Sequence, residues 1–278
     1  MVPDERPLPQ EEARREVYSC IEAWKTIFET KFNGKLEYAY AKGSGIKEWS
    51  SPIDYVPLLS DVDIHIKIIG DESLLGSPET AMEEALEVSE EYERLFLEMN
   101  PDPLHVPRTQ VVVLNKAAKD PRFLLPMESD DIYVMFGEPD LRKAPLKEKM
   151  RTVDQENLMD LEGVLHSLPM SAMDKTGLEY WYMIRRLVWH VSPAPVRLLT
   201  QVAEDPEEAW ILNRTKVCDK LEEHGFHGLS QSYWDYYLLG WEMFFTDLRD
   251  TQIMRRVVSK AYDVLESALR LAKQIDPK

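Results

Sequence analysis

The clearest pattern in the chain is a strict alternation of polar and apolar positions just after residue 60. Polar residues alternate with branched apolar residues in the run Asp61-Val62-Asp63-Ile64-His65-Ile66-Lys67-Ile68. Successive side chains of a strand point to opposite faces, so this period of two predicts a strand over residues 61–69 that is buried on one face.

Other runs in the first half also predict regular elements. Apolar residues recur at helical spacing from Glu11 to about Lys31 and from Pro78 to about Met99. Short runs of aromatic or β-branched residues predict strands over residues 36–41, 110–114 and 132–136. The pair Gly43-Ser44 forms a turn after the first of these strands, and residues 45–49 are expected to form a short helical piece whose N-terminus points at the turn.

From about Leu146 onwards the pattern predicts helices only, with breaks near Pro169 and near residues 192–195, 205–206 and 224–225. Helices of roughly 15–25 residues with short connections predict an antiparallel bundle. The last helix, over residues 251–275, carries an apolar stripe of Val257, Val258, Ala261, Leu265, Ala268, Leu269 and Ala272. The chain is therefore interpreted as an α+β domain over residues 1–145 followed by an all-α domain over residues 146–278.

Composition narrows the range of partners and compartments. The formal net charge is −17 at pH 7, and binding of long nucleic acids depends on many Lys and Arg contacts, so a broad phosphate-binding surface is not expected. A local basic pocket is compatible with this charge. Cys20 and Cys218 lie far apart within predicted helices, which argues against a disulfide framework and against a thiolate zinc site. No apolar run of about 18 residues occurs, so a cytoplasmic protein without a membrane span is expected.

Asp61 and Asp63 are candidate ligands of a divalent cation. Positions on one face of a strand lie about 6.5–7 Å apart, so both carboxylates can converge on one cation or on an adjacent pair. The small-residue turn Gly43-Ser44 can present backbone N–H groups to a phosphate. These features predict a magnesium–nucleotide site. The plainer interpretations are a solvated strand face for the carboxylates and ordinary turn chemistry for the glycine and serine.

The combination resembles the Gly-Ser…Asp-x-Asp signature of the DNA polymerase β-like nucleotidyltransferase superfamily. The resemblance covers about residues 10–140 and rests on Gly43-Ser44, on the strand before it and on Asp61-Val62-Asp63. It implies a mixed β-sheet with flanking helices, and the helical second half is similar to that of small-molecule enzymes such as the aminoglycoside-modifying ones. It also implies that Gly43, Ser44 and Lys42 contact an NTP, and that Asp61 and Asp63 hold Mg²⁺ or Mn²⁺.

The sequence departs from this family in two places. The interval from Ser44 to Asp61 is longer than usual, and residues 50–57 are interpreted as an inserted loop. The superfamily usually has a third carboxylate on a neighbouring strand, yet the run 110–114 carries no acid. Asp131 is one candidate for that role and for a third metal ligand. Acids of the helical half are further candidates, as in aminoglycoside-type relatives: Asp154, Glu156, Asp160 and Glu179.

The remaining candidate residues have less specific patterns. His65 continues the carboxylate face and is expected to be a polar neighbour at the rim, with metal ligation as the alternative. His224 and His227 flank a glycine, for which a loop is the plainer interpretation. Most aromatic residues of the helical half are expected in its core, although one or two could stack on a base or an acceptor ring. Cations that either contact phosphates or form surface salt bridges are Arg185, Arg186 and Lys216.

The resemblance implies transfer of a nucleoside monophosphate, AMP from ATP or from another NTP, to an acceptor hydroxyl with release of pyrophosphate. A small molecule or a protein side chain is expected as the acceptor, because the net charge disfavours a long nucleic acid. A tRNA or RNA terminus is a further alternative. The missing third acid motivates an alternative from another class, a non-catalytic binding module of the same fold such as a toxin-neutralising subunit. Hydrolysis of a nucleotide without transfer is a third possibility.

Overall fold

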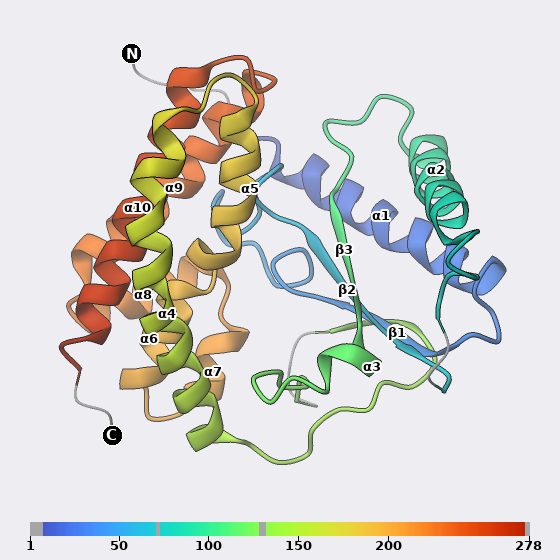
Figure 1. The fold of residues 1–278 in the computed structure, drawn as a ribbon, viewed down its shortest axis with the longest axis horizontal. Helices are drawn as coiled ribbons and strands as arrows, with labels where there is room; N and C mark the ends of the chain where they lie inside the picture. The colour runs from blue at the N-terminus through green and yellow to red at the C-terminus, as the bar shows by residue number, and fades with distance from the viewer. Residues whose placement is uncertain (1–7, 71–72, 128–131, 276–278) are drawn as a thin grey trace. The chain divides into compact units, whose positions relative to one another are not determined.

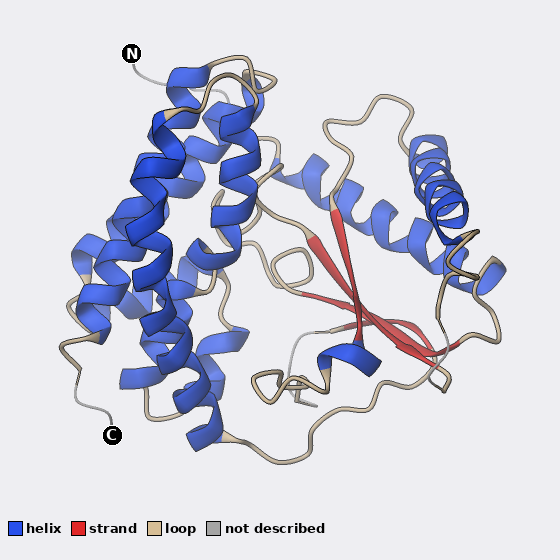
Figure 2. Cartoon of the chain, viewed as in Figure 1, coloured by secondary structure: helices blue, strands red, loops and turns tan. Residues whose placement is uncertain are grey.

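The computed structural model describes residues 8–70, 73–127 and 132–275, and the chain folds into two compact units. Unit 1 comprises Met1–Lys47 and Ser60–Lys143, and unit 2 comprises Glu48–Leu59 and Ala144–Lys278. Every strand in the described residues belongs to unit 1, whereas unit 2 is built from helices (Figures 1 and 2). An α+β chain with a mostly helical second half is therefore confirmed.

Unit 1 contains a four-stranded mixed sheet in the order β3-β2-β1-β4. Strand β1 pairs antiparallel with both β2 and β4, and β2 pairs parallel with β3. Each predicted strand is present, and no end is shifted by more than one residue: β1 (Leu36–Lys42), β2 (Val62–Ile68), β3 (Thr109–Val113) and β4 (Tyr133–Phe136).

The helices of unit 1 pack beside this sheet. They are α1 (Gln10–Thr30), α2 (Ala81–Met99) and the short α3 (Leu114–Ala117). Helix α1 contacts α2 and β4, and α3 contacts β2. The apolar side chains predicted for one face of β2 are all buried. Full burial of each such side chain contributes about 1.5–3 kcal/mol to the free energy of unfolding. They are Val62, Ile64, Ile66 and Ile68.

Unit 2 is a helical assembly around its last helix. Helix α10 packs against α9, α5, α4 and α6. All residues of the predicted α10 stripe are buried, so that prediction is confirmed. The helices are α4 (Lys147–Met173), α5 (Glu179–Val191), α6 (Ala194–Val202), α7 (Pro206–Ile211), α8 (Arg214–Glu223), α9 (His227–Phe245) and α10 (Thr251–Ala272).

Three predictions about helices are wrong. Helices α5, α6, α7 and α8 have 13, 9, 6 and 10 residues, shorter than the roughly 15–25 residues expected. Pro169 lies inside α4, which continues to Met173, because the buried residues Leu161, Leu165 and Leu168 hold the helix to its neighbours despite the missing N–H. Residues 45–49 form no helix. The amides of Ile46 and Lys47 both donate to the carbonyl oxygen of Gly43, which closes a single turn.

The inserted segment belongs to the helical unit. Residues 48–59 group with unit 2, whereas the sequence interpretation placed them within a domain over residues 1–145. The side chains of Ile53, Tyr55 and Val56 are fully buried there, so the segment contributes apolar residues to a core. Of the helices in the part of the chain that the structure describes, none combines the length and apolarity that a membrane crossing requires.

Candidate functional site

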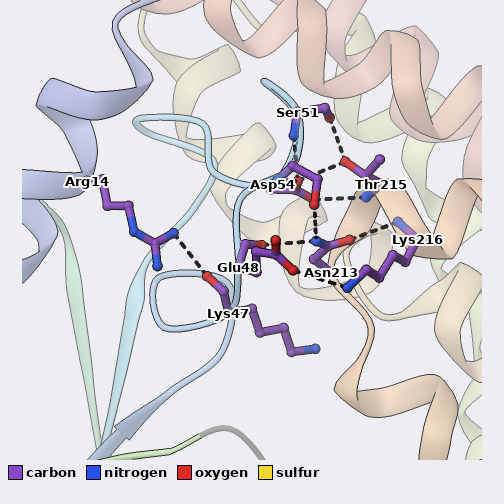
Figure 3. A network of polar contacts seen from close by, with 9 residues as sticks. Arg14, Lys47, Glu48, Ser51, Asp54, Asn213, Thr215 and Lys216 are labelled. Carbon is purple, nitrogen blue, oxygen red and sulfur yellow. Dashed lines mark hydrogen bonds and ion pairs between the residues drawn. The ribbon is translucent and has the colours of Figure 1, made fainter.

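The Gly43-Ser44 turn is held in place by α1 and β2. Gly43 has a φ of 88°, a left-handed conformation that glycine adopts without steric cost. A Cβ on Gly45 would lie 3.4 Å from both Val17 of α1 and Val62 of β2, so the turn is packed closely between these elements. Arg14 of α1 also donates to the carbonyl oxygen of Lys47 at 3.2 Å (Figure 3).

The carboxylate of Asp63 lies directly against this turn. The antiparallel register of β1 and β2 pairs Lys42 with Asp63. A Cβ on Gly43 would lie 2.6 Å from Asp63 Oδ2, a distance shorter than any tolerated contact. Gly43 is therefore required here both for its φ and for the space that the carboxylate takes. Lys42, Gly43 and Asp63, three of the predicted site residues, are brought together by the strand pairing.

Asp61 precedes β2 and is engaged by an arginine that the sequence pattern did not single out. Arg108 Nη2 donates to Asp61 Oδ2 at 3.2 Å, and the two side chains are only 18% and 21% exposed. The contact follows from the parallel pairing of Val62 with Thr109, which places the preceding residues of the two strands side by side. No local pattern in the sequence could have identified Arg108, because the contact joins residues 47 positions apart through the pairing of two strands.

His65 is a core residue, and the expectation of a polar neighbour at the rim is wrong. It is 4% exposed, and its Nδ1 lies 3.2 Å from the hydroxyl of Tyr40 on β1. The ring also stacks near Phe123, with centroids 6.1 Å apart. Burial, and secondarily the charge of Lys42, lower the pKa of His65 to about 3, so the imidazole is neutral at physiological pH.

The donor set on β2 is of a type that suits Mg²⁺ or Mn²⁺. Asp61 and Asp63 supply carboxylate oxygens, which are the ligands that these hard cations prefer. Among the described residues, no group of three or more His, Cys, Asp or Glu side chains is arranged to hold a metal ion. Asp131, the predicted third ligand, lies outside the described residues.

The candidate substitutes for a third acid have partners of their own in unit 2. Asp154 is 3% exposed and accepts a hydrogen bond from Trp210 Nε1 at 2.9 Å, while Arg197 Nε lies 3.6 Å from its other oxygen. Burial raises the pKa of Asp154 to about 6, although Trp210 and Arg197 act in the opposite direction. Glu179, the first residue of α5, accepts from the amide of Thr176 in the preceding turn at 3.0 Å. Glu156 and Asp160 lie on α4.

Other predicted candidates have structural roles. Lys216 forms an ion pair with Glu48 at 3.2 Å (Figure 3). His227 opens α9 after the left-handed Gly225, in agreement with a loop at this point. Burial raises the pKa of the thiols of Cys20 and Cys218 to about 12, so neither supplies a thiolate near neutral pH.

Residues 48–59, the anchored segment, connect the Gly43-Ser44 turn to Asp61 and are fixed to the start of α8. Asp54 is 2% exposed, and its Oδ2 accepts from the amides of Ser50 and Ser51 at 2.7 and 2.9 Å. The amide of Thr215 donates to Oδ1, and its hydroxyl donates to Oδ2, both at 2.8 Å (Figure 3). This carboxylate therefore organises both the segment and the first turn of α8.

Backbone carbonyls of the anchored segment are bonded as well. Arg214 Nη1 donates to the carbonyls of Ile53 and Asp54 at 3.0 and 3.1 Å, and its guanidinium lies 3.9 Å from the ring centroid of Tyr237. Trp241 Nε1 donates to the carbonyl of Pro52 at 2.9 Å. The sequence pattern did not predict these contacts, although the apolar residues within the supposed loop were a signal that it is buried.

A cavity of about 420 Å³ opens at the opposite end of β2 from Asp61. Its lining residues are Glu37, Lys67, Ile68, Gly70, Asn115 and Lys119. Neither the Gly43-Ser44 turn nor the carboxylates of Asp61 and Asp63 line it. The candidate site is therefore defined by the turn and the start of β2, and this cavity is a separate feature.

Comparisons with known proteins return no family for the chain. No family model matches the sequence, no curated protein matches it, and no solved structure matches the fold. The function is therefore inferred from the residues and geometry of the site.

Proposed function

We propose that the chain is a magnesium-dependent nucleotidyltransferase that moves a nucleoside monophosphate, AMP from ATP in the first instance, to an acceptor hydroxyl. The observation that carries this proposal is the approach of the Asp63 carboxylate to Gly43, where a Cβ would lie 2.6 Å from Oδ2. A carboxylate of the cation-binding type thus adjoins a backbone turn of the phosphate-binding type. Such a pair is what a metal–triphosphate complex requires from a protein.

Each residue of the site has a defined role in this proposal. The Gly43-Ser44 turn binds the triphosphate, and Lys42, paired with Asp63 in the sheet, adds a positive charge beside it. Asp61 and Asp63 hold Mg²⁺ or Mn²⁺, which supplies charge neutralisation for the triphosphate. Arg108 donates to Oδ2 of Asp61. Because a carboxylate has a second oxygen, Asp61 can bind the cation through Oδ1 while it keeps the ion pair with Arg108.

The proposed reaction is an in-line displacement. The acceptor oxygen bonds to the α-phosphorus, the bond from that phosphorus to the bridging oxygen of the β-phosphate breaks, and pyrophosphate leaves with the electron pair. The proton of the hydroxyl passes to a carboxylate or to water. Because little covalent chemistry is needed, positioning and charge balance account for most of the catalysis. A small molecule or a protein side chain remains the proposed acceptor.

The transfer reaction is tested with the double variant Asp61→Asn/Asp63→Asn. Each α-³²P-labelled NTP is incubated with Mg²⁺ and pools of metabolites, proteins or RNA. The wild-type chain is expected to label one pool, and the double variant at least about 100-fold less, because the amides bind the cation poorly. Asp102→Asn, an exposed acid of unit 1, serves as the control. Unchanged labelling by the double variant would overturn the proposal.

The variant Gly43→Ala separately tests the close approach of the Asp63 carboxylate to Gly43. The new methyl group is expected to displace Asp63 and to raise the KM for the NTP. Gly34→Ala is the matched control, because Gly34 has a similar φ of 83° but a Cβ there would meet no atom within 4 Å. Both changes carry a backbone cost of about 1 kcal/mol, so only an additional loss of NTP affinity in Gly43→Ala reports on the site.

The ion pair between Asp61 and Arg108 favours a second candidate, a non-catalytic module that binds a nucleotide or a partner protein with the same residues. Titration calorimetry distinguishes the two. Magnesium-dependent ATP binding without pyrophosphate release in any acceptor pool would favour the module. Pyrophosphate release that depends on an acceptor would favour the transferase, and nucleotide breakdown without an acceptor would indicate hydrolysis.

A further inference from the structure

Helix α5 presents an exposed face of aromatic and basic residues, here called the α5 face: Tyr182, Arg185, Arg186 and Trp189. Their spacing of three, four and seven positions places them on one side of the helix. Tyr182 is 67% exposed and Trp189 is 60% exposed. Large planar side chains with this exposure are unusual in a helix whose opposite side is buried core.

The arginines of the α5 face are not balanced by carboxylates. The chain contains 50 acidic and only 33 basic residues, so an arginine would be expected to find an acidic partner. Some other exposed arginines do, namely Arg94, Arg256 and Arg270. Within the described part of the chain, neither Arg185 nor Arg186 forms an ion pair or a side-chain hydrogen bond.

Two arginines of other helices lie near α5 as well. The guanidinium of Arg255, from α10, lies 4.9 Å from the ring centroid of Tyr180 at the start of α5. The pKa of His190, next to Trp189, is lowered first by burial and then by the charges of Arg197 and Arg186. The only acid of the helix, Glu179 at its first position, accepts from the amide and the hydroxyl of Thr176 in the preceding turn. Arg185 and Arg186 therefore place two positive charges on the exposed side of α5, on a chain of strongly negative net charge.

We propose that the α5 face binds a short segment of single-stranded nucleic acid, with bases stacked on Tyr182 and Trp189 and phosphates paired with Arg185 and Arg186. Stacking on exposed aromatic rings combined with arginine contacts is how proteins hold single strands without reading their sequence. An acidic peptide would satisfy the arginines but would leave both rings exposed, so it fits less well. The inference stands apart from the proposed transfer reaction.

The dimensions and the charge limit the ligand to a few nucleotides. The α-carbons of Tyr182 and Trp189 are about 10.5 Å apart along the helix axis. Bases of one strand stack at about 3.4 Å, so about three or four nucleotides span that distance. The two arginines neutralise about two phosphates, which predicts weak binding and a slope of about −1.4 for log K against log salt.

Binding is tested on the full chain with fluorescein-labelled octamers of adenylate and of uridylate, by anisotropy between about 20 and 200 mM salt. Tyr182→Ala and Trp189→Ala are each expected to weaken binding at least about fivefold, the lower end of a lost stacking contact. Arg185→Gln/Arg186→Gln is expected to bring the salt slope towards zero. Tyr262→Ala and Arg270→Gln, exposed on α10 of the same unit, serve as matched controls. Circular dichroism melting shows whether each variant is folded.

Several outcomes would overturn the proposal. The first is that the wild-type chain binds neither octamer at the lowest salt concentration. The second is that the α10 control variants lose as much affinity as the α5 variants. The third is that a polyglutamate peptide of the same charge displaces the octamer as well as unlabelled octamer does. A dimer that dissociates on Tyr182→Ala would assign the face to a second copy of the chain. The Asp61→Asn/Asp63→Asn variant is expected to retain octamer binding, so failure of the transferase proposal and failure of this one are distinguishable.

Discussion

At the scale of single residues, His65 shows how a polar position on the candidate strand became part of a core. It alternates with apolar residues as a solvated side chain would, yet Tyr40 bonds its Nδ1 and Phe123 lies over its ring. A buried imidazole with one neutral hydrogen-bond partner is stabilised only in its uncharged form. The folded state therefore resists protonation at this position.

This resistance predicts a pH dependence of stability. The pKa of His65 is about 3 in the folded chain, against about 6.5 when unfolded. Between these values only the unfolded state takes up the proton, so the contribution of His65 to the free energy of unfolding is full above pH 6.5 and falls as the pH falls. The loss attributable to His65 is about 2 kcal/mol between about pH 6.5 and 5. Urea unfolding of the wild type and of His65→Gln at both pH values measures it.

The comparison with His65→Gln is necessary because Asp154 changes the free energy of unfolding in the opposite direction as the pH falls. Its pKa is raised to about 6, so its contribution to stability is lost as the pH rises through that value. Subtracting the free energy of unfolding of His65→Gln from that of the wild type removes the contribution of Asp154 and of every other group that the two proteins share. His166→Gln, which changes an exposed histidine of α4 that has no ion pair among the described residues, is expected to follow the wild type. If the curves of the wild type and His65→Gln are parallel from about pH 7 to 5, the buried neutral state of His65 is contradicted.

At the scale of elements, the anchored segment and α8 depend on one another. A supposed loop carries a buried carboxylate that accepts from backbone amides of the segment itself and from the start of α8. Leu58 near its end has a φ of 72°, a conformation that costs a non-glycine residue about 1 kcal/mol or more. This conformation persists because the contacts of the neighbouring residues contribute more free energy than it costs.

Asp54→Ala is expected to destabilise unit 2 by about 3 kcal/mol, because it leaves several buried N–H donors without an acceptor. Hydrogen exchange should show the effect as faster exchange of the Ser50, Ser51 and Thr215 amides. Asp219→Ala, which removes an exposed carboxylate from α8, provides a matched comparison with little expected change. A loss smaller than about 0.5 kcal/mol in Asp54→Ala would show that this carboxylate does not organise the segment.

At the scale of the whole molecule, unit 2 is discontinuous in sequence. The chain passes between units after Lys47, after Leu59 and after Lys143. Gly240 of α9 packs so closely against the anchored segment that a Cβ there would lie 2.4 Å from Leu59 and 2.9 Å from Val56. The helical half is therefore incomplete without residues that come from the first half of the sequence.

A fragment of residues 144–278 is accordingly expected to have a lower melting temperature than unit 2 has in the full chain. Without residues 48–59, Trp241 Nε1 and Arg214 lose their carbonyl partners and buried apolar surface is exposed. A synthetic peptide of residues 48–59 should raise the melting temperature of the fragment in a concentration-dependent way. The same peptide with Asp54→Ala should be less effective. A fragment as stable as unit 2 in the full chain, and insensitive to the peptide, would contradict this dependence.

The amino-acid sequence by itself determined most of the regular elements, because period-two and helical patterns record which side of a local segment is buried. The break at Pro169 and the helical piece at residues 45–49 were exceptions. It also singled out Gly43, Asp61 and Asp63 as candidate site residues, since a turn and a strand can be recognised from neighbouring residues. The partners of these groups depend on segments far apart in the chain. Arg108 reaches Asp61 through parallel strand pairing, and Thr215 reaches Asp54 across 161 positions. Only the tertiary structure decided these contacts, because chain topology, and no local pattern, brings such residues together.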